Sequence, residues 1–126
     1  MKIVIPIEPR TKKNSQQIVM VKGRPIIMPS KIYKKYEKDC FEYITDDQKL
    51  NIDYPVEVRC HFFLGTHRKC DLTNLLQAVD DILVMAGVLS DDNYSIICSH
   101  DGSRVFYDKE NPRTEIEICQ KTEDFI

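Results

Sequence analysis

The sequence predicts an α+β fold: a single two-layer domain whose mixed, mostly antiparallel sheet carries two main helices. Three observations favour this fold. Short segments alternate apolar and polar residues as strands do, two segments have helical periodicity, and no regular strand–helix–strand repeat runs through the chain. The chain has 126 residues, of which 42% are hydrophobic and 30% charged. That size and composition suit one globular domain, residues 1–126.

The first third of the chain predicts a strand, a hairpin and a helix. Isoleucines alternate over residues 3–7, and the apolar runs 18–21 and 26–28 flank a turn-like Lys22-Gly23-Arg24-Pro25. Ser30 is a favourable N-cap for the helix. The residues expected on its apolar face are Ile32, Tyr36, Cys40 and Tyr43. A lysine stripe on the opposite side is formed by Lys31, Lys34, Lys35 and Lys38.

The rest of the chain predicts a second helix among four strands. Residues 56–64 alternate most regularly, and residues 94–99, 104–107 and 114–119 are the other predicted strands. Between them, residues 71–86 predict a helix that ends at Gly87. Its continuous apolar face comprises Leu72, Leu75, Leu76, Val79, Ile82, Leu83 and Ala86.

Several protein classes are disfavoured by the composition. No apolar run is long enough to cross a bilayer, and the N-terminus is too short and too alternating for a signal peptide. The five cysteines are odd in number and form no C-x-x-C pair, so we expect reduced thiols in a cytoplasmic protein. A zinc site built from Cys60, His61, His67 and Cys70 fits no common ligand spacing.

Charge is distributed unevenly along the chain. Residues 1–39 hold ten Lys or Arg against three acids, a net of +7, whereas the remaining 87 residues carry a net of −9. Between Asp71 and Asp92 there are five aspartates and no Lys or Arg. This asymmetry indicates one half that faces a polyanion and an acidic half that carries the chemistry. The lysine stripe fits either a solvated face or contact with phosphates.

The acidic half contains two candidate groups of ligands. Asp71, Asn74, Ala78 and Asp81 form a narrow stripe beside the buried face of the second helix, and Asp91-Asp92-Asn93 follows that helix. Each group also has a plain structural explanation, an N-cap for Asp71 and a solvated turn for the second group. If the chain doubles back after Gly87, the two groups meet. Oxygen ligands without clustered His or Cys would then suit Mg²⁺ or Mn²⁺ beside the basic Arg68-Lys69.

At this helix the sequence resembles the RusA-like Holliday junction resolvases, endodeoxyribonucleases of bacteria and their phages. The resemblance rests on the segment from Arg68 to Leu83 and on Ala86-Gly87-Val88-Leu89-Ser90-Asp91-Asp92. The openings Pro9-Arg10-Thr11-Lys12-Lys13-Asn14-Ser15 and Pro29-Ser30-Lys31 also look like that family. The similarity covers most of the chain.

The resemblance implies a Mg²⁺-dependent homodimer, with Mn²⁺ as a substitute, that nicks four-way DNA junctions symmetrically in recombination and repair. Asp71 and Asp92 match the family's catalytic, metal-binding carboxylates, and Asp91 is a further expected ligand. Asn74 and Asp81 match positions close to the site. The residues expected to contact DNA are Lys12, Lys13, Asn14, Arg24, Lys31, Lys34, Lys35, Arg68 and Lys69.

The sequence departs from the family at two positions in the expected site. Thr73 replaces the family's second aspartate, and Gln77 replaces its catalytic lysine. Losing one such charge-stabilising group typically costs about 10²–10³ in rate. Three hypotheses therefore remain: an active junction nuclease with a reduced site, a branched-DNA-binding protein that no longer cuts, and a structural domain without affinity for DNA at low salt.

Overall fold

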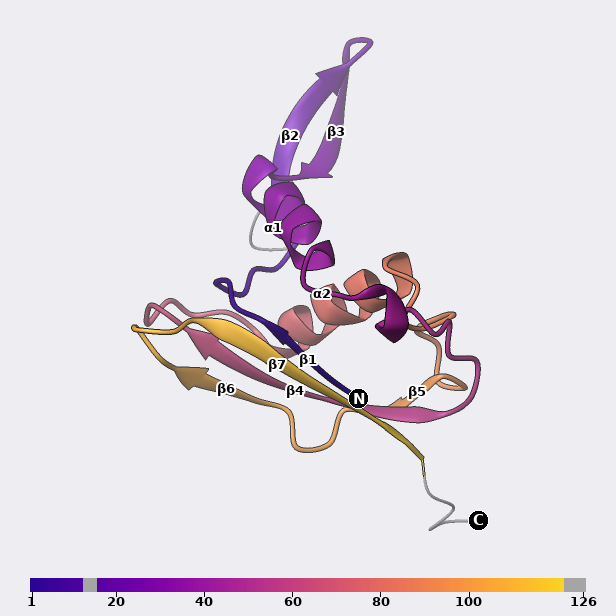
Figure 1. Ribbon diagram of the computed structural model, residues 1–126. Coiled ribbons are helices and arrows are strands. Elements are labelled where there is room, and N and C mark those ends of the chain that lie inside the picture. The colour runs from indigo at the N-terminus through magenta and orange to yellow at the C-terminus, as the bar shows by residue number, and fades with distance from the viewer. Residues whose placement is uncertain (13–15, 122–126) are drawn as a thin grey trace.

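The central element of the main sheet is β4 (Val56–Leu64). In the computed structural model, which describes residues 1–12 and 16–121, β4 pairs antiparallel with β7 (Arg113–Gln120), and β7 pairs antiparallel with β1 (Lys2–Ile5). On its other side β4 pairs in parallel with β5 (Ile97–Ser99) and β6 (Arg104–Tyr107). The predicted α+β fold with a mixed, mostly antiparallel sheet is confirmed (Figure 1).

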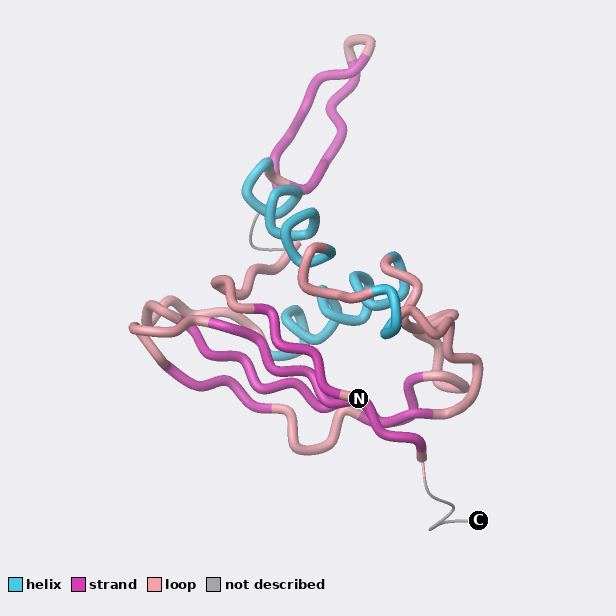
Figure 2. The backbone as a smooth tube through the Cα atoms, viewed as in Figure 1, coloured by secondary structure: helices cyan, strands magenta, loops and turns pink. Residues whose placement is uncertain are grey.

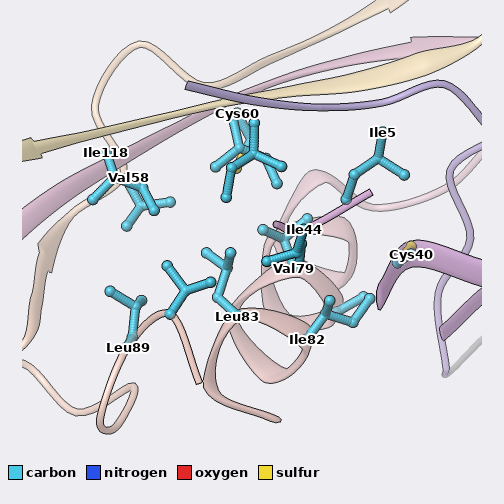
Figure 3. Close-up of a cluster of buried hydrophobic side chains, with 14 of the residues drawn as sticks. Ile5, Cys40, Ile44, Val58, Cys60, Val79, Ile82, Leu83, Leu89 and Ile118 are labelled. Atoms are coloured by element: carbon cyan, nitrogen blue, oxygen red, sulfur yellow. The ribbon is translucent and has the colours of Figure 1, made fainter. Parts of the chain in front are cut away.

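The helix α2 (Leu72–Met85) lies on one face of this sheet. Its side chains Leu75, Val79, Ile82 and Leu83 are buried, together with alternate residues of β4 from Val56 to Phe62. Figure 3 shows Val79, Ile82 and Leu83 of the helix pointing toward Val58 and Cys60 of the strand. Because each element buries one face only, Thr73 and Gln77 remain exposed on the outer side of α2.

The helix α1 (Lys31–Phe41) begins at the predicted N-cap. The Tyr33 backbone N–H donates to Ser30 Oγ at 3.2 Å. The predicted apolar face is partly wrong: Tyr33, Tyr36 and Cys40 are buried, whereas Ile32 is exposed and Tyr43 lies beyond the helix and is exposed. Positions 33, 36 and 40 share one face of a helix as well as positions 32, 36 and 40 do. Periodicity alone therefore did not decide whether Ile32 or Tyr33 is buried. The lysine stripe faces outward as predicted.

A hairpin of β2 (Gln16–Val21) and β3 (Arg24–Pro29) forms a separate two-stranded sheet. Lys22 and Gly23 both have positive φ, 50° and 78°, which is the backbone of a two-residue type I′ turn. The strands are longer than the predicted apolar runs and include Arg24 and Pro25. Figure 2 shows the hairpin projecting past α1, away from the five-stranded sheet.

The connection after α2 turns away from the helix. Gly87, with φ 83°, ends it, and the next residues run beside 51–52: the Asn51 N–H donates to the Gly87 carbonyl at 2.9 Å, and Leu89 forms a parallel bridge with Ile52. Residues 94–96 belong to a turn, so β5 is shorter than the predicted strand 94–99. A short 3-10 helix (Asp46–Gln48) precedes this region.

The cysteines Cys40, Cys60, Cys70, Cys98 and Cys119 are all free thiols. Within residues 1–12 and 16–121, none of the helices has both the length and the apolar character that a bilayer crossing requires.

Candidate active site and DNA-facing residues

Asp71 lies at the N-cap position of α2, but its carboxylate does not cap the helix. The side chain makes no capping hydrogen bond, and the Asp71 backbone carbonyl instead accepts from the N–H groups of Asn74 and Leu75. Asn74 Nδ2 donates to Asp71 Oδ2 at 3.4 Å. The exposed carboxylate therefore stands at the positive end of the helix dipole and is oriented by an amide one turn away. These contacts leave it open to a ligand.

Asp91 organises the exposed loop that follows α2. Its Oδ1 accepts from the Asp92 N–H at 2.7 Å, and its Oδ2 accepts from Asn93 Nδ2 at 3.1 Å. These bonds, the one to the Asp92 backbone first, lower the pKa of the Asp91 carboxyl. Asn93 Oδ1 in turn accepts from the Ser95 N–H at 2.9 Å. The predicted turn is present, and both Asp91 oxygens are used to hold it.

The two acidic groups do not meet within the chain. Among the described residues, no group of three or more His, Cys, Asp and Glu side chains is placed to hold a metal ion, although Asp71, Asp91 and Asp92 are all described. Convergence of the two groups is not seen within one chain, because α2 begins directly after Asp71 and the chain leaves its other end at Gly87. A helix of 14 residues is about 21 Å long. Figure 1 shows the loop before α2 at one end of it and the 87–96 connection at the other.

Asp81 lies between these ends and contacts the N-terminal segment. Lys12 Nζ is 3.3 Å from Asp81 Oδ2, and it also lies 5.8 Å from the centre of the Tyr33 ring. Lys12, expected to contact DNA, thus joins the segment before the hairpin to α2. Asn74 and Asp81 are half-buried and Ala78 is fully buried, so the predicted stripe runs along the edge of the core.

Arg68 is engaged by the N-terminal segment as well. Its guanidinium pairs with Glu8 Oε1 and donates to the Pro9 carbonyl, while the Gly65 N–H donates to Glu8 Oε2 at 2.8 Å. Glu8 therefore fixes the loop that leads into Asp71. Lys69, the next residue after Arg68, is exposed.

The other residues expected to contact DNA lie around the hairpin and α1. Arg24, Lys31, Lys34 and Lys35 are exposed, and Lys35 Nζ pairs with Asp39 Oδ2 at 2.6 Å. Lys13 and Asn14 lie outside the described residues.

His100 and Asp80 form a pair that the sequence pattern did not reveal. His100 Nε2 lies 2.9 Å from Asp80 Oδ2, and its Nδ1 lies 2.8 Å from the Val58 carbonyl. Both ring nitrogens face acceptors, so the imidazolium form satisfies both, and the hydrogen bond to Asp80 raises the pKa of His100. Burial raises the pKa of Asp80, and the nearby charges of Asp92 and Asp81 act in the same direction. The only available signal was an aspartate inside the apolar helix, and it did not indicate a partner.

A comparison with protein families matches residues 6–119 to the model of endodeoxyribonuclease RusA. The chain belongs to the RusA family. A comparison with individual curated proteins gives no match.

The match includes both helices, β4, β5, β6 and all but the last residue of β7, and it begins just after β1. RusA proteins are endodeoxyribonucleases that act on branched DNA and depend on divalent metal. The described residues of the single chain do not gather the ligands for that metal: α2 begins directly after Asp71, and the 87–96 connection, which carries Asp91 and Asp92, leaves its other end. Thr73 and Gln77, at which the sequence was expected to depart from the family, lie one turn apart on the exposed side of α2.

Proposed function

We propose that this RusA chain is a Mg²⁺-dependent endonuclease that nicks four-way DNA junctions symmetrically as a homodimer, with Mn²⁺ as a substitute. The family match supports the nuclease class. The observation that links this activity to the start of α2 is the carboxylate of Asp71, which is open to a ligand and matches an expected metal-binding position of the family. Recombination and repair in a bacterium or its phage are the setting that a junction nuclease implies.

The proposed metal site is shared by two chains. Mg²⁺ requires near-octahedral oxygen coordination and keeps several waters, so it needs carboxylates that converge. A two-fold axis that runs perpendicular to α2 and passes beside its middle brings the start of one helix next to the end of the other. Asp71 of one chain would then face the partner's Asp92, and each dimer would contain two equivalent sites. Two equivalent sites are what two symmetric cuts require.

Exposed apolar side chains at the end of α2 support this pairing. Met85 in its last turn, Leu50 beside it and Tyr94 in the following connection are all exposed. Leu50 adjoins this end because its neighbour Asn51 bonds to Gly87. Apolar residues gathered on a surface mark contact sites more often than free surface.

Each residue of the proposed site has a distinct task. Asp71, held by Asn74, and Asp92 would hold the metal, while Asp91 uses its own oxygens to orient Asp92. A bound divalent metal lowers the pKa of its water and offsets charge on the scissile phosphate. Lys69 is free to contact the DNA backbone beside Asp71.

Cleavage of a synthetic four-way junction in Mg²⁺ or Mn²⁺ tests the proposal. Asp71→Asn and Asp92→Asn should each slow nicking by about 10²-fold or more, because a neutral amide binds metal weakly, and should leave junction binding intact. Glu57→Gln, at an exposed carboxylate on the face of β4 turned away from α2, is the control and should cut normally. Equal nicking by the wild type and Asp92→Asn would contradict the proposal.

A second candidate is a branched-DNA-binding protein with impaired cleavage, favoured by Thr73 and Gln77. Both are exposed on α2, so Thr73→Asp/Gln77→Lys should fold and should raise the nicking rate by about 10²-fold. Thr73→Asn/Gln77→Met keeps the size of the new side chains without charge and should give no gain. Single-turnover nicking measures the effect. Rapid cutting by the wild type would exclude this candidate.

A further inference from the structure

One face of the β2–β3 hairpin consists of apolar side chains that the described residues of the chain leave exposed. Ile18 pairs with Ile27 and Met20 with Pro25, and directly paired residues of antiparallel strands share a face. Ile18, Met20 and Ile27 are 73%, 64% and 67% exposed, and Pro25 is exposed too. We call Ile18, Met20, Pro25 and Ile27 the hairpin apolar face. Isolated two-stranded hairpins are only marginally stable in water, so such a face is costly unless a partner covers it.

The charge around the hairpin apolar face has one sign. Residues 9–36 contain eight Lys or Arg and no Asp or Glu. Lys22 and Arg24 are exposed at the tip, and Lys31 follows the hairpin at the start of α1. Like charges of this density oppose the packing of two hairpins from two copies against each other, whereas they attract a polyanion.

The segment that leads into the hairpin contacts α2 between the two ends that would form the proposed active site. Lys12, just before β2, contacts Asp81 on α2. The two-residue turn fixes the tip, and Figure 1 shows the hairpin standing clear of the sheet and of α2. A DNA arm that crosses the outer face of α2 would therefore meet the hairpin beside it.

We propose that the hairpin apolar face inserts into the open centre of branched DNA and lies against exposed base-pair faces, while Lys22 and Arg24 contact phosphates. This inference rests on the proposed function, and it adds a structural source for the protein's preference for branched DNA over duplex DNA. Duplex DNA presents phosphates but no free base-pair face, so basic residues alone bind both forms. Ile, Met and Pro are among the side chains that proteins wedge between base steps. A branch point presents both apolar base-pair faces and charged phosphates, and an apolar face bordered by basic residues can contact both.

The variant Ile18→Ser/Ile27→Ser tests the inference. Affinity for a four-way junction should fall about tenfold, affinity for a duplex of equal length should change less than about twofold, and the fluorescence rise of 2-aminopurine at the branch point should disappear. Ile32→Ser, a control at a 60% exposed position outside the hairpin apolar face, should behave as the wild type. Lys22→Gln/Arg24→Gln should weaken both complexes in parallel and make binding less dependent on salt.

An unchanged ratio of junction to duplex affinity in Ile18→Ser/Ile27→Ser would overturn the inference, even if the protein cuts junctions. Dissociation of the DNA-free protein into smaller species in that variant, seen by light scattering, would overturn it in favour of an interface between copies. If junction affinity alone falls while Asp92→Asn cuts as well as the wild type, the inference stands and the proposed metal site fails. A wild type without affinity for branched DNA would remove both.

Discussion

His100 links three parts of the molecule through its two ring nitrogens. It contacts Asp80 on α2 and the Val58 carbonyl on β4, and it follows directly on β5. Asp80 is close enough to Asp92 for that charge to act on its pKa. The pair therefore ties the end of β5, the strand that follows the connection carrying Asp91 and Asp92, to α2. We assign it a positioning role.

This pair predicts a pH dependence of stability. The pKa of His100 is raised above 6.5 by its bond to Asp80, so its stabilising effect is complete below about pH 6.5 and is lost as pH rises through the folded pKa. The free energy of unfolding, measured in urea from about pH 5.5 to 8.5, should fall over the upper part of that range. His100→Gln should lower stability by about 2 kcal/mol at acidic pH and flatten the fall. If the free energies of unfolding of the wild type and of His100→Gln fall in parallel with pH, the role assigned to His100 is contradicted.

The sequence predicted the local role of single residues more successfully than the distant residues that they contact. Ser30 as an N-cap follows from local chemistry, and the structure confirms it. Arg68 and Lys12 were expected to face DNA, whereas they contact Glu8 and Asp81, which lie about sixty or more positions away in the chain. Contacts of that kind depend on the packing of distant segments, and a local pattern does not encode them.

At the scale of elements, the orientation of α2 decides which residues are available for chemistry. Its buried face fixes Thr73 and Gln77 on the opposite side, and its N-terminus presents Asp71. The apolar periodicity predicted this orientation because seven apolar residues at helical spacing have only one common face.

Substitution of α2 residues should separate its two faces. Leu83→Ala should lower the free energy of unfolding by about 3 kcal/mol, since Leu83 is fully buried against the sheet. Gln77→Ala, a truncation at an exposed position of the same helix, should cost less than about 0.5 kcal/mol. Urea unfolding of both variants measures the difference. Equal losses would mean that the helix is rotated from this orientation.

The sheet shows where element-level prediction stopped. The strands β1, β4 and β7 were predicted from alternation. The parallel pairing of β5 and β6 with β4 was not predicted, and it arises because α2 crosses over between β4 and β5. Alternation does not specify the direction of pairing. In α1, two neighbouring residues, Ile32 and Tyr33, competed for one buried position, and packing rather than period selected the tyrosine.

At the scale of the whole molecule, the charge asymmetry of the sequence corresponds to a division of space. The basic third contains the projecting hairpin and most of α1, and the acidic remainder contains α2 and every strand of the main sheet except β1 (Figure 1). The acidic ligands were predicted, but their meeting within one chain was not found. A site shared between chains leaves no signature in one sequence, because a pattern of spacings describes only intramolecular neighbours.

Mixing two inactive variants tests the shared site most directly. In a dimer of Asp71→Asn with Asp92→Asn, a site shared between chains is intact once, because one subunit supplies Asp71 and the other supplies Asp92. After subunit exchange, the mixture should recover nicking of one strand per junction, with about a quarter of the sites intact. Each variant alone should stay inactive. If the mixture remains as inactive as its components while heterodimers form, each site belongs to one chain and the account is contradicted.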